Sequence, residues 1–375
     1  MRKLRKLAEY GQSFWLDDLS RDLIQSGELA RRIADQDLRG ITSNPAIFAN
    51  SIGNSTAYDA QLRELAAAGR TTTAIYEALT TSDVRDACDL LRPVYDATDG
   101  VDGYVSLEVS PLLARDTEAS IAEGRHLATL VDRPNLMIKI PGTVEGIPAV
   151  ETLLADGINV NVTLLFSVER YQAVAEAWLR ALERRHAAGL PLARVASVAS
   201  FFVSRIDTLV DQLIDHRLRP DGSSPVTPSP AHLRGRIAIA SAKLAYAGYR
   251  RMVGTERWQR LAEAGARPQR LLWASTGTKN PAYGDTLYVD TLIGPDTVNT
   301  MPLATAAAFG DHGKPARTLV RGVPDARRAL RELKAAGIDL RYVTWQLEND
   351  GIQKFIEPYA KLLAGIEKKR SSAPA

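Results

Sequence analysis

The chain has 375 residues, of which 45% are hydrophobic and 24% are charged, and its formal net charge is +3. This is the composition of an ordinary globular protein. The charge is small, and no basic block is joined to an aromatic platform, so the sequence gives no indication of nucleic acid as a partner.

Cys88 is the only cysteine, which excludes an intrachain disulfide, and we expect it to be a buried apolar residue. No apolar run reaches the roughly 18 residues that a membrane-spanning helix needs. The first ten residues are charged and lack the apolar core of a secretion signal. The sequence therefore predicts a cytoplasmic protein that has no membrane as a partner.

Eight segments have the apolar runs or the alternating pattern of β-strands. They lie at residues 13–17, 40–44, 103–109, 135–140, 158–163, 195–203, 270–276 and 297–301.

Nearly all of these strands are separated by segments with apolar residues at helical spacing. After a basic, helical lead-in over residues 1–11, we expect a helix that Ser20 caps. Further helices are expected at residues 57–68, 71–94, 117–130, 146–156, 168–187, 206–217, 231–252 and 258–265.

Two other regions lie outside the alternation of strands and helices. Residues 220–230 are rich in Pro, Ser and Gly and predict a surface loop. A C-terminal extension over about residues 311–375 should pack on the rest of the chain. In it we expect a helix at 325–336, a short strand-like piece at 339–343 and a closing helix at 348–367.

Strands that alternate with helices predict a parallel sheet. A doubly wound sheet that binds nucleotides should have a glycine-rich turn after its first strand, and neither G-x-G-x-x-G nor G-x-x-x-x-G-K-[ST] occurs. We therefore favour one α/β domain over residues 1–375, a (β/α)8 barrel with extra helices.

Lys139 lies at the C-terminal end of its strand, on the opposite face from Leu136, Ile138 and Ile140. It could be a salt-bridged lysine at a strand end. It could also be a nucleophile, because burial or a nearby cation lowers the pKa of a lysine amine. A neutral amine forms a Schiff base with a ketone or an aldehyde.

Further polar residues recur near the C-terminal ends of the strands, where barrel enzymes have their active sites. With the lysine they cover six strands and comprise Asp17, Asn44, Glu108, Lys139, Asn161, Thr163 and Ser200. Seven polar residues at one level of a barrel are hard to explain as separate salt bridges, which favours the nucleophile.

The sequences GITSNPAI at residues 40–47 and LMIKIPGTVEGI at residues 136–147 resemble the two signature motifs of the transaldolase family. GINVNVTLLFS at residues 157–167 is similar to a third block of that family. WLDDLSRD at 15–22 and the run over 275–302 resemble the longer bacterial members.

The resemblance implies a class I aldolase barrel that transfers a dihydroxyacetone unit between sugar phosphates in the non-oxidative pentose phosphate pathway. The donor would be sedoheptulose 7-phosphate or fructose 6-phosphate, and the acceptor glyceraldehyde 3-phosphate or erythrose 4-phosphate. No metal or organic cofactor is expected, and both a monomer and a homodimer remain open.

The resemblance also implies a role for each polar residue. The catalytic set would be Lys139 as the Schiff base, Glu108 acting through a water that Thr163 positions, and Asp17 for the sugar hydroxyl proton. The binding set would be Asn44 and Asn161 for the dihydroxyacetone hydroxyls, and Ser200 and Arg205 for phosphate.

Each role has a structural alternative. Asp17 could cap a helix, and Asn44 before Pro45 could be a turn residue. The remaining alternatives are that Asn161 and Thr163 fill the barrel bonded to each other, and that Arg205 pairs with Asp207 or Glu169.

The chain departs from the shorter transaldolases after its seventh strand, where many of them have a phosphate-binding arginine. Here the sequence reads ASTGTKN over residues 274–280, and Lys279 is the candidate replacement. A lysine binds phosphate as a point charge and lacks the bidentate fork of arginine.

Two other functions remain open. An aldolase that cleaves fructose 6-phosphate and releases free dihydroxyacetone would share these motifs, because the difference depends on the access of water. The length and the motifs favour the transferase. A catalytically silent barrel that binds sugar phosphates would be expected to lack Lys139 or Glu108, and both are present.

Overall fold

The computed structural model describes residues 2–218 and 229–371, and within them eight parallel strands close into a barrel. Each strand pairs with the next along the chain, and β8 returns to β1 over five residue pairs. The strands are β1 (Gln12–Leu16), β2 (Gly40–Thr42), β3 (Tyr104–Glu108), β4 (Leu136–Pro141), β5 (Val160–Leu165), β6 (Ser197–Phe202), β7 (Arg270–Ala274) and β8 (Thr297–Met301).

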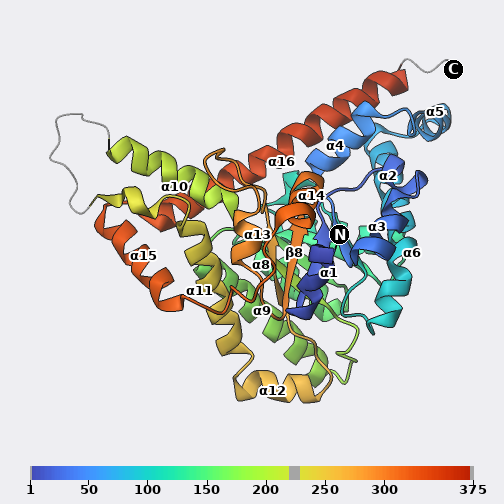
Figure 1. Cartoon of the computed structure of the whole chain (residues 1–375). Coiled ribbons are helices and arrows are strands. Elements are labelled where there is room, and N and C mark those ends of the chain that lie inside the picture. Colours follow the sequence, from blue (N-terminus) through green and yellow to red (C-terminus); the bar gives the residue numbers. More distant parts are fainter. Residues whose placement is uncertain (1, 219–228, 372–375) are drawn as a thin grey trace.

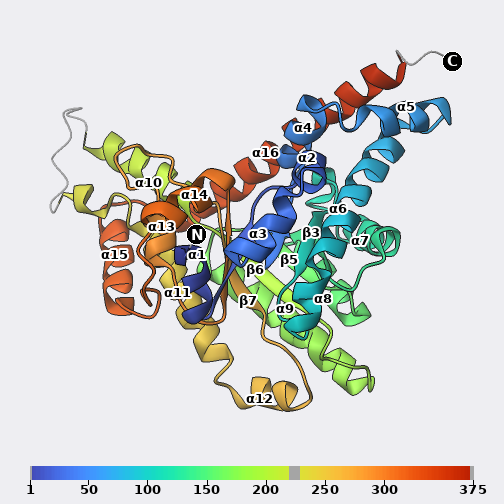
Figure 2. The same ribbon diagram turned by 45° about the vertical axis from the view of Figure 1, so that its right-hand side comes forward.

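Helices surround the barrel on its outside (Figures 1 and 2). The first half of the chain forms α1 (Arg2–Glu9), α2 (Arg21–Gln25), α3 (Glu28–Gln36), α4 (Pro45–Asn54), α5 (Asp59–Ala67), α6 (Thr72–Ala97), η1 (Pro111–Leu113), α7 (Thr117–Val131), α8 (Gly146–Asp156) and α9 (Val168–Ala187). The second half forms α10 (Ser204–Arg217), η2 (Pro230–Leu233), α11 (Ile237–Met252), α12 (Glu256–Glu263), α13 (Leu287–Thr291), α14 (Leu303–His312), α15 (Val323–Ala335) and α16 (Leu340–Ser371).

All eight predicted strands and the closed parallel barrel are confirmed. The strand residues are buried throughout, apart from a partly exposed Arg270. This is expected of a parallel sheet that helices cover on one face and side chains fill on the other. Cys88 is also buried, as predicted.

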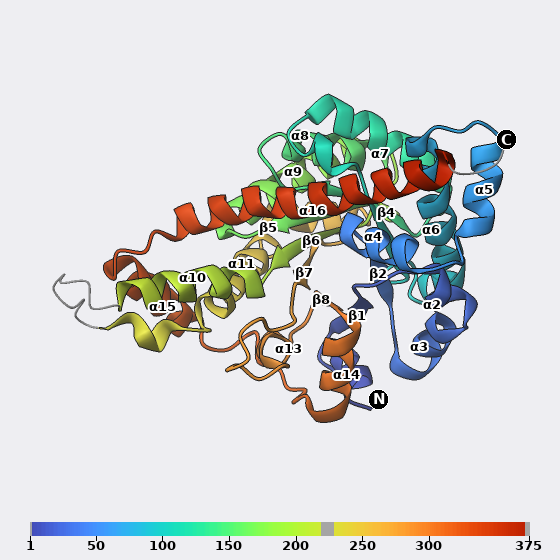
Figure 3. The same ribbon diagram turned by 90° about the horizontal axis from the view of Figure 1, so that it is seen from above.

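The last helix, α16, is 32 residues long and crosses the barrel at one end, as the view from above shows (Figure 3). The helix begins near α15, and its C-terminal part is fixed on the other side of the barrel, near α5 and α6. There Thr72 of α6 donates a hydrogen bond to Glu367, and Lys369 lies 2.7 Å from Asp59 of α5. Residues far apart in the sequence thus meet above the strands.

The predicted strand-like piece at 339–343 is wrong, because α16 begins at Leu340. Asp339 accepts a hydrogen bond from the backbone N–H of Arg341, which helps to start the helix. Val343 and Leu347 are buried one turn apart, so the apolar residues follow the helical period.

The sequence also predicts no helix where α3, α4, α13 and α14 lie. In α4, Pro45 ends the strand segment and is also the first residue of the helix, a position that proline favours. The predicted helix at 231–252 begins only at Ile237, after the turn η2. Of the predicted loop at 220–230, residues 220–228 lie outside the described residues.

At the end of the barrel opposite α16, a buried carboxylate joins three parts of the chain. Asp102, just before β3, accepts hydrogen bonds from Ser13 at 2.7 Å, from the indole of Trp15 at 3.1 Å and from Arg270 at 2.9 Å. Burial alone would raise the pKa of Asp102, but the Arg270 charge and these donors outweigh it and hold that pKa below its usual range. Gly40 makes room for this arrangement, because a Cβ there would lie 2.4 Å from the Trp15 ring.

We expect Asp102→Asn to destabilise the fold by on the order of 3–5 kcal/mol, because it leaves the charge of Arg270 without its buried partner. Urea unfolding at pH 7 measures this loss. Since the folded pKa lies below the unfolded value of about 3.9, the contribution of the carboxylate is complete above that value. It should disappear as the pH falls through the folded pKa.

Asp96→Asn is the matched control, because the Asp96 side chain is 54% exposed and pairs with Arg92 on the surface. Its loss should stay below about 1 kcal/mol. Equal losses in the two variants would contradict the assignment of a buried, structural ion pair to Asp102.

Candidate active site

The strand register places Glu108 beside Lys139, where β3 pairs with β4. Their charged atoms, Oε2 and Nζ, lie 2.9 Å apart, and Lys139 also donates a hydrogen bond of 2.8 Å to the carbonyl of Ser43. Glu108 is only 6% exposed and Lys139 only 4%. Burial raises the pKa of Glu108, and the adjacent Lys139 charge opposes this shift. The salt bridge considered from the sequence is therefore present, but it lies inside the barrel.

Lys139 lies against a cavity of about 150 Å³ at the C-terminal ends of the strands. Seven of the nine predicted site residues line it: Asp17, Asn44, Lys139, Thr163, Ser200, Arg205 and Lys279. The other two, Glu108 and Asn161, contact members of this set. The structure thus brings together residues that are spread over more than 260 positions of the sequence, from Asp17 to Lys279.

Asp17 is held in place from the side of β2. It accepts a hydrogen bond of 2.7 Å from the hydroxyl of Thr42, which lies 2.7 Å from the hydroxyl of Thr300. Burial raises the pKa of Asp17, against the opposing effects of Lys139, the Thr42 hydrogen bond and Arg205. The helix-cap alternative fails, because Ser20 caps α2. A buried carboxylate of raised pKa facing a cavity is suited to proton transfer.

The two asparagines are used differently. Asn44 caps α4, since its Oδ1 accepts the backbone N–H of Ile47, and it also lines the cavity. Asn161 donates to Ser106 of β3 at 3.0 Å and accepts from Ser200 of β6 at 2.6 Å, so it ties three strands together inside the barrel. Its predicted alternative partner, Thr163, is not one of these contacts.

Three buried polar atoms near Lys139 have no hydrogen-bond partner within the described parts of the chain. They are Oγ1 of Thr163, Oε1 of Glu108 and Nη1 of Arg205. A buried polar group without a partner costs free energy, and such groups in a native protein often belong to a functional site. Thr163 and Arg205 both line the cavity, where a ligand could bond to them.

Two cations reach the cavity from the segments that follow β6 and β7. Arg205 is in the first turn of α10, after β6, with its guanidinium 5.3 Å from the ring centre of Phe202. The predicted alternative partner Asp207 is instead bonded to Tyr288 and to the backbone of Ala238. Lys279 comes from the loop after β7. A phosphate group could bind between such a pair of charges.

Sequence reasoning missed several residues of the cavity. Thr42 and Thr300 are strand residues of the same inward-facing level as Asp17, and the strand parity could have found them. Phe202 directly follows Phe201, and the sequence does not distinguish it from a residue of the hydrophobic core. Phe355 comes from α16, and nothing in its surrounding sequence indicates that this helix reaches the lysine.

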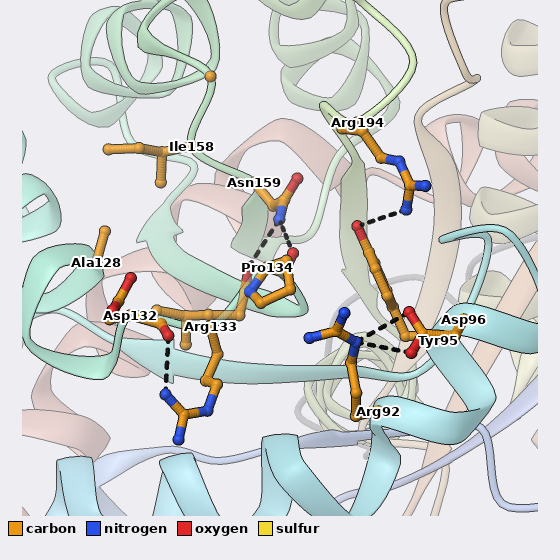
Figure 4. Close-up of a pocket in the computed structure, with 12 residues that line it drawn as sticks. Arg92, Tyr95, Asp96, Ala128, Asp132, Arg133, Pro134, Ile158, Asn159 and Arg194 are labelled. Atoms are coloured by element: carbon orange, nitrogen blue, oxygen red, sulfur yellow. Dashed lines mark hydrogen bonds and ion pairs between the residues drawn. The ribbon is translucent and has the colours of Figure 1, made fainter.

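A second hollow, of about 640 Å³, lies where β4 and β5 begin, at the other end of the barrel (Figure 4). Its three arginines already have partners: Arg92 pairs with Asp96, Arg194 donates to the hydroxyl of Tyr95, and Arg133 pairs with Asp89. Barrel enzymes have their active sites at the opposite end, where the strands finish. We therefore place the candidate active site at Lys139.

Comparison with known proteins agrees with this choice. The family model described as transaldolase/fructose-6-phosphate aldolase matches residues 14–366. A protein named transaldolase from Thermobifida fusca is 52% identical over 361 residues, which cover 96% of each chain. The chain belongs to this family.

Two further relatives match over a similar share of the chain. Transaldolase 2 of a Nostoc species is 49% identical and covers 98% of this chain and 97% of its own. A transaldolase of a Parafrankia species is 50% identical over 99% of both chains. The resemblance inferred from the sequence motifs is confirmed, and the protein is an enzyme of the transaldolase type. Among the described residues, the structure contains no helix with the length and apolarity that crossing a membrane requires.

Proposed function

We propose that this enzyme transfers a dihydroxyacetone unit between sugar phosphates, in the cytoplasm, through a Schiff base on Lys139. The observation that carries the proposal is the buried Lys139–Glu108 pair at a cavity that Asp17 and two cations also reach. The donor would be sedoheptulose 7-phosphate or fructose 6-phosphate, and the acceptor glyceraldehyde 3-phosphate or erythrose 4-phosphate. The reaction belongs to the non-oxidative pentose phosphate pathway.

The first step needs a neutral amine and a way to remove water. With Nζ and Oε2 only 2.9 Å apart, Glu108 can accept a proton from the Lys139 ammonium. The amine then attacks the ketone of the donor, and the resulting carbinolamine loses water to give the protonated imine. The proton that Glu108 took up would leave with that water, and the hydroxyl of Thr163 would hold the water in position.

The second step breaks a carbon–carbon bond of the donor. Asp17 would take the proton of the sugar hydroxyl next to that bond, while the protonated imine accepts the electron pair and becomes an enamine. The aldehyde product leaves, and the enamine carbon attacks the acceptor aldehyde. Asp17 returns its proton to the new hydroxyl, so a single carboxylate serves both directions.

The remaining residues would orient the substrate. The amide of Asn44 and the second N–H of Asn161, which Ser106 does not use, are neutral donors for the dihydroxyacetone hydroxyls. Ser200, Arg205 and Lys279 would hold the phosphate. Placing the substrate by neutral groups at one end and cations at the other fixes its direction in the cavity.

The nearest alternative is an aldolase that releases free dihydroxyacetone, since the description of the matched family includes fructose-6-phosphate aldolase. The relatives named transaldolase, which match over nearly the whole of both chains, favour the transferase. An assay with fructose 6-phosphate, with and without erythrose 4-phosphate, separates the two. Turnover that depends on the acceptor supports the transferase, and turnover without it supports the aldolase.

Borohydride reduction in the presence of fructose 6-phosphate should add one three-carbon adduct to the peptide that contains Lys139, as detected by mass spectrometry. Lys139→Arg should lose essentially all turnover, because a guanidinium does not deprotonate in proteins. Lys243→Arg is the control, since Lys243 donates to the backbone carbonyls of Thr318 and Arg321 and does not line the cavity. An adduct on Lys243 or Lys279 would refute the assignment.

Replacing each of the two carboxylates should impair a different step of the reaction. Glu108→Gln should slow both the formation and the hydrolysis of the imine, since an amide cannot act as a general acid or base. Asp17→Asn should form the imine normally and fail to break the carbon–carbon bond. Each loss should be on the order of 10²–10⁴ in rate.

The amount of adduct trapped in the first seconds after mixing distinguishes these steps. It should be low for Glu108→Gln and close to that of the unmodified enzyme for Asp17→Asn. Equal trapping in both variants would mean that the roles are wrongly assigned.

Arg205→Ala should raise the KM for erythrose 4-phosphate about ten- to a hundredfold, which corresponds to the roughly 1.5–3 kcal/mol of a charge-assisted hydrogen bond. Lys279→Ala should raise it less, as expected for a single point charge. Both variants should still trap free dihydroxyacetone on Lys139, because that ligand has no phosphate.

Arg217→Ala is the matched control on the same helix as Arg205, since Arg217 donates to the carbonyl of Gly337 at the other end of α10. Its KM should not change. If Lys279→Ala also leaves the KM unchanged, Lys279 is not part of the phosphate site.

A further inference from the structure

Helix α16 brings an aromatic ring over the lysine. The ring centre of Phe355 lies 5.9 Å from Nζ of Lys139, and Phe355 lines the same cavity. Phe355 is only 4% exposed, so its ring is closely packed as well as lining the cavity. It comes from none of the loops that follow the strands, because α16 crosses this end of the barrel from outside (Figure 3).

The position of this helix is set at Gly351, one turn before Phe355. A Cβ at Gly351 would lie 3.0 Å from Cδ2 of Leu164, so the helix rests directly on the end of β5. Leu164 has a left-handed φ of 58° at an irregularity of this strand, between Val162 and Leu165. Such a backbone is costly for a leucine and persists only where its surroundings hold it.

Polar contacts hold α16 on both sides of Phe355. Glu348 pairs with Arg170 of α9 at 3.1 Å, and Asn349 accepts a hydrogen bond from Arg115. Farther along the helix, Glu367 is bonded to Thr72. The ring is therefore held over the lysine from an element that is anchored to both sides of the barrel.

We propose that Phe355 determines the specificity of this enzyme for transfer, by keeping water from the imine carbon between the two half-reactions. This inference rests on the proposed function. A flat apolar ring next to the lysine occupies the space from which water would reach the intermediate, and it offers that water no hydrogen bond. The three-carbon unit then stays bound until the acceptor arrives.

The competing reaction is hydrolysis. The enamine takes up a proton at carbon and becomes the protonated imine of dihydroxyacetone. Water then adds to the imine carbon, the C–N bond breaks, and free dihydroxyacetone leaves with the lysine regenerated as its amine. Hydrolysis consumes one water and needs no other reagent, so the access of water to the imine carbon decides how often it occurs.

The test is the ratio of free dihydroxyacetone released to acceptor product formed, with fructose 6-phosphate and erythrose 4-phosphate as substrates. Phe355→Ala should raise this ratio at least about tenfold, which corresponds to about 1.4 kcal/mol in the relative barrier to water attack. Phe355→Leu restores apolar bulk and should recover most of the original ratio.

Trp345→Ala is the control on the same helix, since Trp345 is 60% exposed and lies away from the cavity. Its ratio should not change. A Phe355→Ala enzyme that loses both reactions equally would overturn the proposal and leave Phe355 with a packing role only.

Two further measurements keep the outcomes distinct. Gly351→Ala should fold, since alanine favours a helix, and by displacing α16 from Leu164 it should raise the ratio in the same direction. If Phe355→Ala does not fold, Gly351→Ala replaces it as the test. An unchanged ratio of dihydroxyacetone to acceptor product in Gly351→Ala would then overturn the proposal. If borohydride traps no adduct on Lys139 of the unmodified enzyme, the proposed function itself fails.

Discussion

The register between β3 and β4 is the constraint on which the site depends. It puts a carboxylate and an ammonium side by side, 2.9 Å apart, in an interior that excludes most water. A buried pair of charges stabilises a fold little, because the desolvation of both groups offsets their attraction. Removing either partner is costly, however, since it strands a charge. The pair is thus better explained by its chemistry than by stability, as the adjacent cavity indicates.

The rest of the barrel interior supports that pair with further polar contacts at two levels. At the far end, Asp102 and Arg270 join β7 to the start of β3. In the middle, Asn161 connects Ser106 with Ser200. Barrel interiors are usually filled by branched apolar side chains. Here hydrogen bonds between strands hold Asn161 in a fixed orientation, on the strand position that pairs with Lys139.

Strand parity explains how much of this could be predicted. Alternation is a local property, so Asp17, Glu108 and Lys139 could be assigned to one face and one end of the barrel from the sequence. The alternation fails beyond Thr163, because β5 is irregular there and Leu164 has a left-handed φ. Leu164 also lies against Gly351 of α16, a contact that the local pattern does not reveal. The prediction for residues 339–343 is wrong for a similar reason. Five residues are too few to distinguish a strand from the first turn of a helix, and the helical period appears only over the following turns.

The contribution of α16 could not be predicted for a different reason. Phe355 lies 216 positions beyond Lys139 in the sequence, and its segment has the ordinary pattern of an amphipathic helix. Only the path of the folded chain brings it to the lysine. No glycine-rich turn or charged motif marks Gly351 either, because its role is to be small at one point of contact.

The position of α16 also gives the cavity two unlike sides. Phe355 covers the lysine from the side of β5, where Gly351 meets Leu164, whereas Lys279 comes from the loop after β7. In the function that we propose, apolar cover would lie over the carbon atoms that react, and the cations would lie where the charged, hydrated phosphate binds. Covering the cations with a ring instead would force the phosphate to lose its water without gaining a partner.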